Sequence, residues 1–325
     1  MENLKLNKMA SENLSKIEMN QVRDGNCCSC KLSMVFKMKY FILTIGLLCL
    51  LQNVSAQYFN YDSGRYENLG KYTAVDSAYL KCSYELTYLK YALNPNVKST
   101  DLQILLIGKT VSKYYSQYKL DYCNYIVDYL MKGHDTHPGI NEKGAWSYEL
   151  FKNYPQGKET VTDIASMLQE NFVYEEEIPV FDWKISDEWQ TIMSYNCQKA
   201  TVSFRGRDFI AWFAPDIPVP NGPWKFGGLP GLILKLSDSD NNFVYECQGL
   251  EQLKNKEVIK YYKLEYTKIS REELDKIYRI FHNDYAAFVV AKTGKGMYIV
   301  DSKTKKTTYV EHSPKKIPYN PIELE

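Results

Sequence analysis

Residues 195–236 read YNCQKATVSFRGRDFIAWFAPDIPVPNGPWKFGGLPGLILKL and carry the clearest information about the fold. Strand-forming residues dominate Gln190–Phe204, Asp208–Phe213 and Leu232–Leu236. Arg205-Gly206-Arg207 separates the first two of these strands, and a glycine there permits a tight reversal of the chain. Short strands that follow one another through turns predict antiparallel neighbours in one sheet.

The loop before the last of these strands is rich in proline and glycine. Pro215–Gly231 contains 5 Pro and 4 Gly in 17 residues, so its backbone is both stiffened and able to adopt unusual angles. In Leu229-Pro230-Gly231-Leu232, Pro and Gly stand at the central positions of a predicted type II turn. The residues expected to shape the loop and the preceding turn are Gly206, Gly228, Pro230 and Gly231.

Strand patterns extend on both sides of this stretch. Tyr79–Leu89 alternates apolar and polar residues, which predicts a half-buried strand. Gln103–Ile107 and Lys109–Tyr118 predict a hairpin around Gly108. Further strands are expected at Trp146–Tyr154, Thr160–Ser166, Phe172–Glu177, Val180–Ile185 and Phe243–Gly249.

Two segments change to a helical period. Asp121–Lys132 has one apolar stripe, with Asp121 expected as its N-cap and Gly133 after its end. A second helix is predicted from Ser270 to about Gly294, and it starts with a capping box formed by Ser270 and Glu273. The sequence therefore predicts a strand-dominated α+β fold. Its antiparallel meander sheet is expected to be open and curved or a partial barrel, with one or two amphipathic helices packed on it.

The N-terminal region has the pattern of a secretory signal peptide. Residues 38–56 combine Lys39, an apolar run over Tyr40–Leu51 and the small-residue site Val54-Ser55-Ala56. The run of 12 apolar residues is shorter than the ~20 residues that span a bilayer, so no permanent membrane helix is expected. The exported chain would be periplasmic, extracellular or on the cell surface.

These features divide the chain into four parts. Residues 1–37 are interpreted as an over-extended start without structure, and residues 38–56 as the signal peptide. Residues 57–301 are expected to form a single strand-rich domain. Residues 302–325 are expected to form a basic, proline-punctuated C-terminal tail.

The composition limits the classes of partner. The chain has 325 residues, 40 Lys+Arg and 39 Asp+Glu, which excludes the strongly basic surface of a general nucleic-acid-binding protein. Its 28 tyrosines suit half-buried sheet faces. We therefore expect a ligand or an envelope protein as partner, and no nucleic acid.

Four cysteines follow the signal peptide, namely Cys82, Cys123, Cys197 and Cys247. In an oxidising compartment they can form two disulfides, with three connectivities. Buried free thiols are the alternative. No two of them have the spacing of metal ligands, and we expect neither a metal ion nor another cofactor.

No familiar catalytic motif is present. The sequence lacks a Gly-x-Ser-x-Gly elbow, a His-Glu-x-x-His helix and a phosphate loop, so no catalytic residue is assigned. His134 and His137 have no further ligand at a suitable spacing. Glu175-Glu176-Glu177 is interpreted as the solvated end of a strand.

Arg205 and Arg207 are the leading candidates for ligand or partner binding, because guanidinium groups bind carboxylate or phosphate with two hydrogen bonds. Alternatively, they pair with Asp208, Asp216 or another nearby carboxylate and fix the loop. Aromatic residues on the stiff loop either form a binding face or fill the end of the sheet core. The candidate site also includes Asp208, Trp212, Trp224, Lys225 and Phe226.

Gly228-Leu229-Pro230-Gly231-Leu232-Ile233 resembles the motif that names the GLPGLI family, a family of secreted Bacteroidota proteins. The approach from Tyr195 to Arg207, the segment Gly222–Phe226 and the ending Tyr319–Leu324 are similar to that family as well. The resemblance implies a secreted, strand-rich protein. It brings no catalytic residues, because the family has no established activity.

The leading hypothesis is a secreted or periplasmic binding or accessory protein. It would hold an apolar or amphipathic ligand, or bind an envelope protein, since a curved sheet packed against a helix can enclose a ligand. One alternative is an extracytoplasmic hydrolase with a site near the Arg205/Arg207 turn. Another is a structural component of a cell-surface complex.

Overall fold

The computed structural model describes residues 70–89, 98–132, 147–165, 170–294, 297–300, 307–313, 316 and 319–325. The expected start segment, the signal peptide and the loop with His134 and His137 lie outside these residues. The chain divides into two compact units. The larger unit draws on Lys71–Tyr122, Glu142–Gly296 and Glu311–Glu325, and the smaller on the other described residues.

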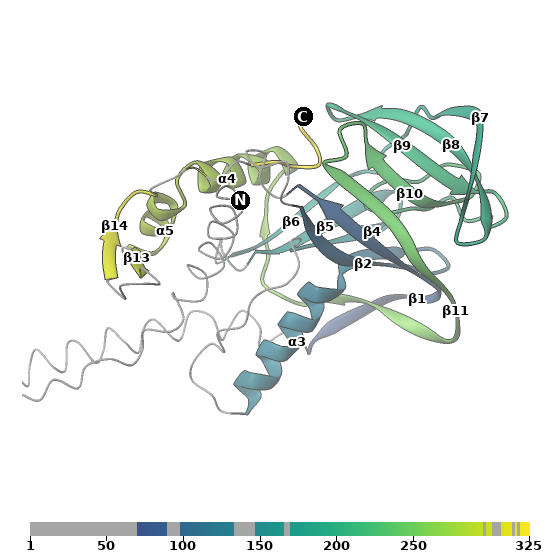
Figure 1. Cartoon of the computed structure of the whole chain (residues 1–325). Helices are drawn as coiled ribbons and strands as arrows, with labels where there is room; N and C mark the ends of the chain where they lie inside the picture. Colours follow the sequence, from purple (N-terminus) through teal and green to yellow (C-terminus); the bar gives the residue numbers. More distant parts are fainter. Residues whose placement is uncertain are drawn as a thin grey trace, which may run out of the picture. The chain divides into compact units, whose positions relative to one another are not determined.

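The larger unit is built on one 12-stranded sheet with the order β12-β6-β5-β4-β3-β2-β1-β11-β10-β9-β8-β7 (Figure 1). The first strands are β1 (Tyr72–Tyr88), β2 (Ser99–Ile107), β3 (Ser112–Ser116), β4 (Tyr148–Lys152), β5 (Lys158–Ala165) and β6 (Glu170–Glu177). The others are β7 (Lys184–Ile192), β8 (Tyr195–Phe204), β9 (Arg207–Ala214), β10 (Leu232–Asp238), β11 (Phe243–Tyr262) and β12 (Thr267–Lys268).

The sheet consists of two antiparallel meanders. β1 to β6 follow one another, β7 to β11 do the same, and the pairing of β1 with β11 joins the two runs. β12 pairs with β6 in parallel, and it lies at the opposite end of the order from β7. The sheet is therefore open, and the prediction of a strand-dominated α+β fold is confirmed.

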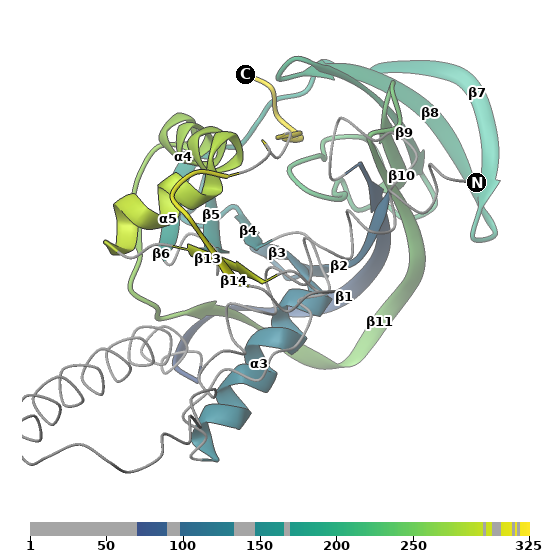
Figure 2. The same cartoon turned by 60° about the vertical axis from the view of Figure 1, so that its left-hand side comes forward.

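The two joining strands are long and curved. β1 has 17 residues and β11 has 20, and their register shifts at three places. Each shift lets one strand bend against its partner. Figure 2 shows β11 curving along the sheet.

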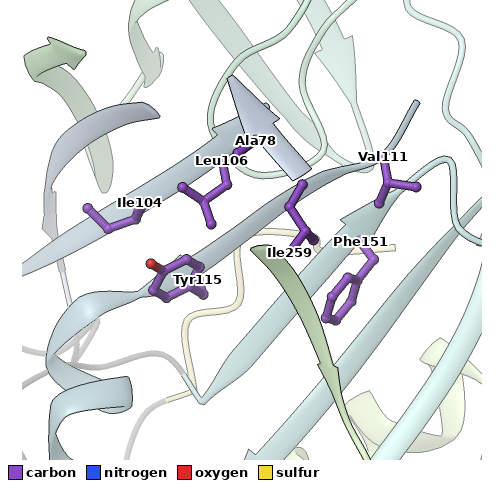
Figure 3. Packing of buried hydrophobic residues seen from close by; sticks show 7 residues of the cluster. All are labelled: Ala78, Ile104, Leu106, Val111, Tyr115, Phe151 and Ile259. Carbon is purple, nitrogen blue, oxygen red and sulfur yellow. The ribbon is translucent and has the colours of Figure 1, made fainter. Parts of the chain in front are cut away.

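An apolar cluster lies on one face of β1 to β4 and β11 (Figure 3). β2 contributes Ile104 and Leu106, and β4 contributes Phe151, which is 0% exposed. The alternation of side chains along each strand brings these residues together. The full cluster is Ala78, Ile104, Leu106, Val111, Tyr115, Phe151 and Ile259.

Local turns explain where the strand predictions were wrong. The predicted strand Gln190–Phe204 is divided by Met193 and Ser194, whose φ angles of 49° and 72° reverse the chain between β7 and β8. The predicted strand Val180–Ile185 is mostly irregular, because β7 begins only at Lys184. β11 continues well beyond the predicted end at Gly249.

Three helices are described. α3 (Gln117–Met131) begins before the predicted Asp121, because the Ser116 hydroxyl accepts the Lys119 N–H and caps the first turn. α4 (Arg271–Asn283) begins with the predicted capping box of Ser270 and Glu273. Asp284 then breaks the predicted long helix and caps α5 (Tyr285–Thr293).

The smaller unit contains β13 (Met297–Val300) and β14 (Thr307–Val310), which pair antiparallel. The predicted C-terminal tail therefore includes a strand, and its last residues, 319–325, belong to the larger unit. None of the described helices is both long enough and apolar enough to cross a membrane.

Candidate functional site

The candidate site begins at the turn between β8 and β9. Arg205 and Gly206 have φ angles of 44° and 76°, as the two central residues of a tight hairpin turn require. This confirms the predicted reversal at Arg205-Gly206-Arg207. The Arg205 carbonyl accepts the Leu324 N–H at 2.9 Å, so the turn contacts the C-terminal segment.

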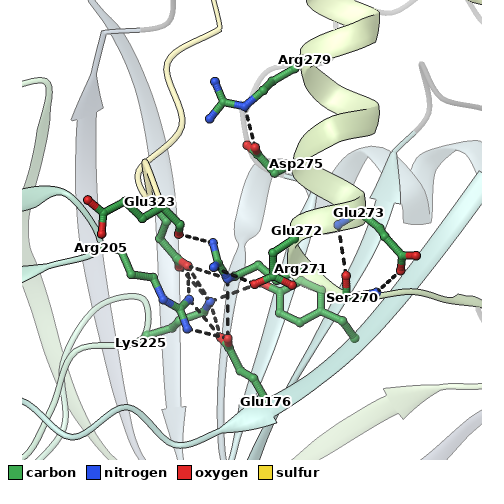
Figure 4. Close-up of polar contacts among 12 residues, drawn as sticks. Glu176, Arg205, Lys225, Ser270, Arg271, Glu272, Glu273, Asp275, Arg279 and Glu323 are labelled. Carbon is green, nitrogen blue, oxygen red and sulfur yellow. Dashed lines mark hydrogen bonds and ion pairs between the residues drawn. The ribbon is translucent and has the colours of Figure 1, made fainter.

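The two arginines hold different parts of that segment. Arg205 pairs with Glu323, and its Nη2 lies 2.6 Å from Glu176 Oε2 on β6 (Figure 4). Arg207 Nη2 donates to Asn320 Oδ1 at 2.7 Å and to the Pro321 carbonyl at 2.8 Å. Both guanidinium groups are therefore engaged within the chain.

Lys225 brings a buried ammonium group to the same place. Its side chain is 0% exposed, and it pairs with Glu176 and with Glu323, whose Oε1 lies 2.8 Å from the Lys225 Nζ. Trp224 Nε1 donates to Glu323 Oε1, also at 2.8 Å. The loop thus supplies two adjacent donors to one carboxylate.

Arg271, the first residue of α4, closes the cluster. Its Nε lies 3.9 Å from carboxylate oxygens of Glu176 and Glu323, and its Nη1 donates to the Glu325 carbonyl. We call the set Glu176, Arg205, Trp224, Lys225 and Arg271, which surrounds Glu323, the carboxylate clamp. β6, the β8–β9 turn, the proline-rich loop and α4 each contribute to it.

The clamp keeps Glu323 ionised. Burial alone would raise the pKa of this carboxyl, but the charges of Lys225 and Arg205 hold it below its ordinary value. Hydrogen bonds from the same two residues act in the same direction. A buried carboxylate is thus balanced by buried and half-buried cations.

Asp238 provides a second anchor beside the clamp. Arg207 Nη1 lies 3.1 Å from Asp238 Oδ2, and both side chains are buried. Asn320 Nδ2 donates to the Leu89 carbonyl at 2.8 Å. Arg207 and Leu89 thus fix Asn320 from two sides.

Lys152 attaches the proline-rich loop to β4. Its ammonium donates to Asn221 Oδ1 at 2.9 Å and to the carbonyls of Gly222 and Phe226 at 3.0 and 2.8 Å. These three acceptors match the three hydrogens of the ammonium. Glu159, its cross-strand neighbour on β5, is 0% exposed. Burial raises the pKa of Glu159 to about 7 and lowers that of Lys152 to about 8.

The aromatic residues of the loop fill the core. Trp224 is 3% exposed, with its ring 5.8 Å from Tyr148. Phe226 is 0% exposed, and its ring centroid lies 4.5 Å from Phe209 and 5.5 Å from Phe204. Their side chains therefore face the protein interior.

The glycines shape the loop differently from the prediction. Gly228, not Gly231, has the left-handed φ angle, at 81°. At Gly231 a Cβ atom would lie 2.2 Å from the Ala214 carbonyl oxygen, so close backbone packing requires glycine there. The predicted type II turn, which needs a positive φ at Gly231, is thus wrong.

The other predicted site residues lie apart from the clamp. Trp212 on β9 is half-buried, with the Lys199 Nζ 6.0 Å from its ring centroid. Asp208 is exposed and accepts the Ser203 hydroxyl. The carboxylates that meet the arginines are instead Glu176, Glu323 and Asp238.

Sequence reasoning missed these carboxylates. Glu176 was expected at a solvated strand end, but its side chain is only 15% exposed. A usable signal was present, because Glu176 shares a strand face with the buried Phe172 and Tyr174. Glu323, Arg271 and Lys152 carried no comparable local signal.

The cysteines are buried. Cys82, Cys197 and Cys247 are free thiols, and Cys123 is buried in α3. Burial raises the pKa of Cys197 and of Cys247 to about 11, which keeps both protonated at neutral pH. Within the described part of the chain, no group of three or more His, Cys, Asp or Glu side chains could hold a metal ion.

Comparisons with known proteins give a short match. The family model described as "Protein of unknown function (Porph_ging)" matches residues 204–235, which run from the β8–β9 turn through the proline-rich loop into β10. No protein of curated function matches the chain.

Two similar solved structures are those of PNGF-II in space groups P21 and C2. They are 14% identical to this chain, with TM-scores of 0.42 and 0.41. The matches cover 62% and 61% of this chain but only 33% and 32% of PNGF-II. The chain thus spans about a third of the length of PNGF-II.

Proposed function

We propose that this chain is an exported binding or accessory protein of the GLPGLI type whose partner is an envelope protein. The match over residues 204–235 includes the GLPGLI hexapeptide and supports that family name. The signal-peptide pattern of residues 38–56 supports export to the periplasm or the cell surface.

The packing of the proline-rich loop favours a partner on the surface over an enclosed apolar ligand. Trp224 packs against Tyr148 of β4, and Phe226 packs against Phe209 of β9. The loop thus fills the space between two parts of the sheet with the chain's own side chains. A partner is then best accommodated on the outside.

The observation that carries the proposal is a run of exposed apolar side chains in the segment that leads into and forms the edge strand β7. Of the 12 large hydrophobic side chains that are exposed among the described residues, five lie within residues 178–193. They are Ile178 and Val180 between β6 and β7, Ile185 and Trp189 on β7, and Met193 in the turn after it, and we call this set the β7 surface. Clustered exposed apolar side chains mark interaction sites, whereas single ones are ordinary.

The charges near the β7 surface indicate what kind of partner would bind it. Asp182 and Asp187 are exposed in this segment, and Lys184 is its one basic residue. Glu188 is exposed as well, and it pairs with Lys199 of β8 at 2.7 Å. β7 pairs only with β8 among the described strands, so its other edge is open. We therefore expect a partner with both basic and apolar side chains.

Site-specific photocrosslinking in the exporting cell tests the proposal. A photoreactive amino acid at Trp189 should give one discrete adduct, and the same residue at Ile280 should give none. Ile280 is a matched control because it is 60% exposed but lies on α4, away from β7. Adducts at neither position, or the same adducts at both, would contradict the proposal.

The same experiment addresses export and the alternative functions. Mass spectrometry of the purified chain should find an N-terminus at Gln57. A stoichiometric adduct that persists through envelope solubilisation would favour a structural component of a surface complex. The hydrolase alternative has no specific support, since Arg205 and Arg207 are engaged by Glu176, Glu323 and Asp238.

A further inference from the structure

The C-terminal segment 319–325 is held as a peptide is held in a binding groove. It forms neither helix nor strand, and its contacts come from side chains and turns of other elements. Arg207 donates hydrogen bonds to the Asn320 side chain and the Pro321 carbonyl, and the Arg205 carbonyl accepts the Leu324 N–H. Ile322 is 6% exposed, so one apolar side chain is buried between these polar contacts.

The clamp without this segment would have an excess of positive charge. Arg205, Lys225 and Arg271 would face only Glu176 and, at Arg271, Glu272, because Glu323 is supplied by the segment itself. The Lys225 side chain is fully buried, and a buried ammonium without sufficient counter-charge is costly. The clamp therefore requires a carboxylate at the place of Glu323.

Tyr319 packs against Tyr278 and His282 of α4, and the rest of the segment is joined to the clamp and its neighbours by a small number of groups. Glu323 provides the charged contact, and Pro321, Leu324 and Glu325 provide backbone hydrogen bonds. Asn320 uses its side chain, which binds Arg207 and the Leu89 carbonyl. An extended peptide with an asparagine and a glutamate at the same spacing offers equivalent groups. The remainder of the recognition surface lies on β6, the β8–β9 turn, the loop and α4.

We propose that the carboxylate clamp is a binding site for an extended, glutamate-containing peptide, and that residues 320–325 occupy it as an exchangeable ligand. A peptide of the type Asn-Pro-apolar-Glu-apolar replaces them, with its glutamate between Lys225 and Arg205. The peptide comes either from a second copy of this chain or from another protein. This site is separate from the β7 surface, so either proposal can fail alone.

The test uses the full chain carrying Glu323→Ala, which leaves the clamp without its carboxylate. The probe is a fluorescent heptapeptide, Tyr-Asn-Pro-Ile-Glu-Leu-Glu, and the control peptide has Gln in place of its first Glu. Fluorescence anisotropy should show the probe binding about 10-fold or more tighter to the variant than to the wild type. The control peptide should bind the variant at least about 10-fold more weakly than the probe, because it lacks the charge-assisted contacts. A folded variant that binds neither peptide, or both equally, overturns the proposal.

A second measurement needs no variant. In the wild-type chain, the Leu324 N–H should exchange with deuterium by local opening, much faster than the buried Ala211 N–H on β9. Equal exchange rates would mean that the segment leaves only on global unfolding, and the proposal would be wrong. Sedimentation then distinguishes the sources: dimers that form with rising concentration indicate a second copy, and a monomer throughout indicates another protein.

Discussion

The apolar cluster around Phe151 and the carboxylate clamp around Glu323 are both buried, but different forces hold them together. Phe151 and Lys152 are consecutive on β4, so their side chains point to opposite faces of the strand. On the Phe151 face, apolar residues from neighbouring strands are held together by the burial of their apolar surface. On the Lys152 face, Lys152 donates to three neutral oxygens, and Lys225 pairs with Glu176 and Glu323. The Phe151 face also holds one buried ion pair, between Lys113 and Glu149, so the two faces differ in their share of charged groups.

The two regions should respond differently to substitution. Burial of apolar area contributes about 25 cal/mol per Å², and this contribution does not depend on whether any one neighbouring group is ionised. A buried ion pair contributes little net stability, but the loss of one partner leaves an uncompensated charge. The contribution of the apolar side chains of the cluster should therefore be insensitive to pH, and that of the clamp should not.

Phe151→Ala should have the largest effect, since it opens a cavity among residues that cannot fully collapse. We expect a loss of about 3–5 kcal/mol in the free energy of unfolding, measured by urea denaturation and equal at pH 5 and pH 8. Val180→Ala is the control, because Val180 is 97% exposed and should change stability by less than about 0.5 kcal/mol. A loss below about 1 kcal/mol for Phe151→Ala would refute the role assigned to the cluster.

Lys225→Met should cost somewhat less, about 3 kcal/mol at pH 7, because Glu176 and Glu323 would then face each other with less counter-charge. Adding Glu323→Gln should restore part of the loss, since it removes one of the two carboxylates that Lys225→Met leaves with less counter-charge. Urea denaturation of the single and double variants measures this coupling. If the losses in the free energy of unfolding from the two substitutions simply add, Lys225 and Glu323 do not act as a coupled pair.

Glu159 gives the pH dependence of the charged face. Its pKa is raised to about 7 in the folded chain from an ordinary value near 4.5, through burial opposed by Lys152 and Lys225. The stabilising contribution is thus fully present below pH 4.5 and is lost as the pH rises through 7. Between pH 5 and pH 8 the wild type should lose on the order of 2 kcal/mol that Glu159→Gln retains. If the free energy of unfolding of the wild type and of Glu159→Gln, measured by urea denaturation, changes with pH in the same way, the role assigned to Glu159 is contradicted.

The contrast between local patterns and contacts that join distant residues explains what the sequence could predict. The alternation in Tyr79–Leu89, the reversal at Gly206 and the Ser270 capping box are local patterns, and the structure contains all three. The clamp joins Arg205 to residues 29 and 118 positions away, and no periodic pattern links such distant charges. The candidate residues Arg205 and Lys225 were identified by residue type, but their partners depended on the sheet order.

Gly206→Ala should have the smallest effect, and it tests how closely the C-terminal segment lies on the clamp. Gly206 has a φ of 76°, and an added Cβ would lie 3.0 Å from the Leu324 Cβ. Gly157→Ala is the matched control, because Gly157 has a φ of 82° but no atom within 4 Å of the added Cβ. Both variants should lose about 1 kcal/mol from backbone strain, and Gly206→Ala should lose up to about 1 kcal/mol more from displacing Leu324. Because the two strains are alike, the difference between the variants in urea denaturation reports only the contact with the segment. Equal losses, with unchanged deuterium exchange at the Leu324 N–H, would mean that the segment lies farther from the turn.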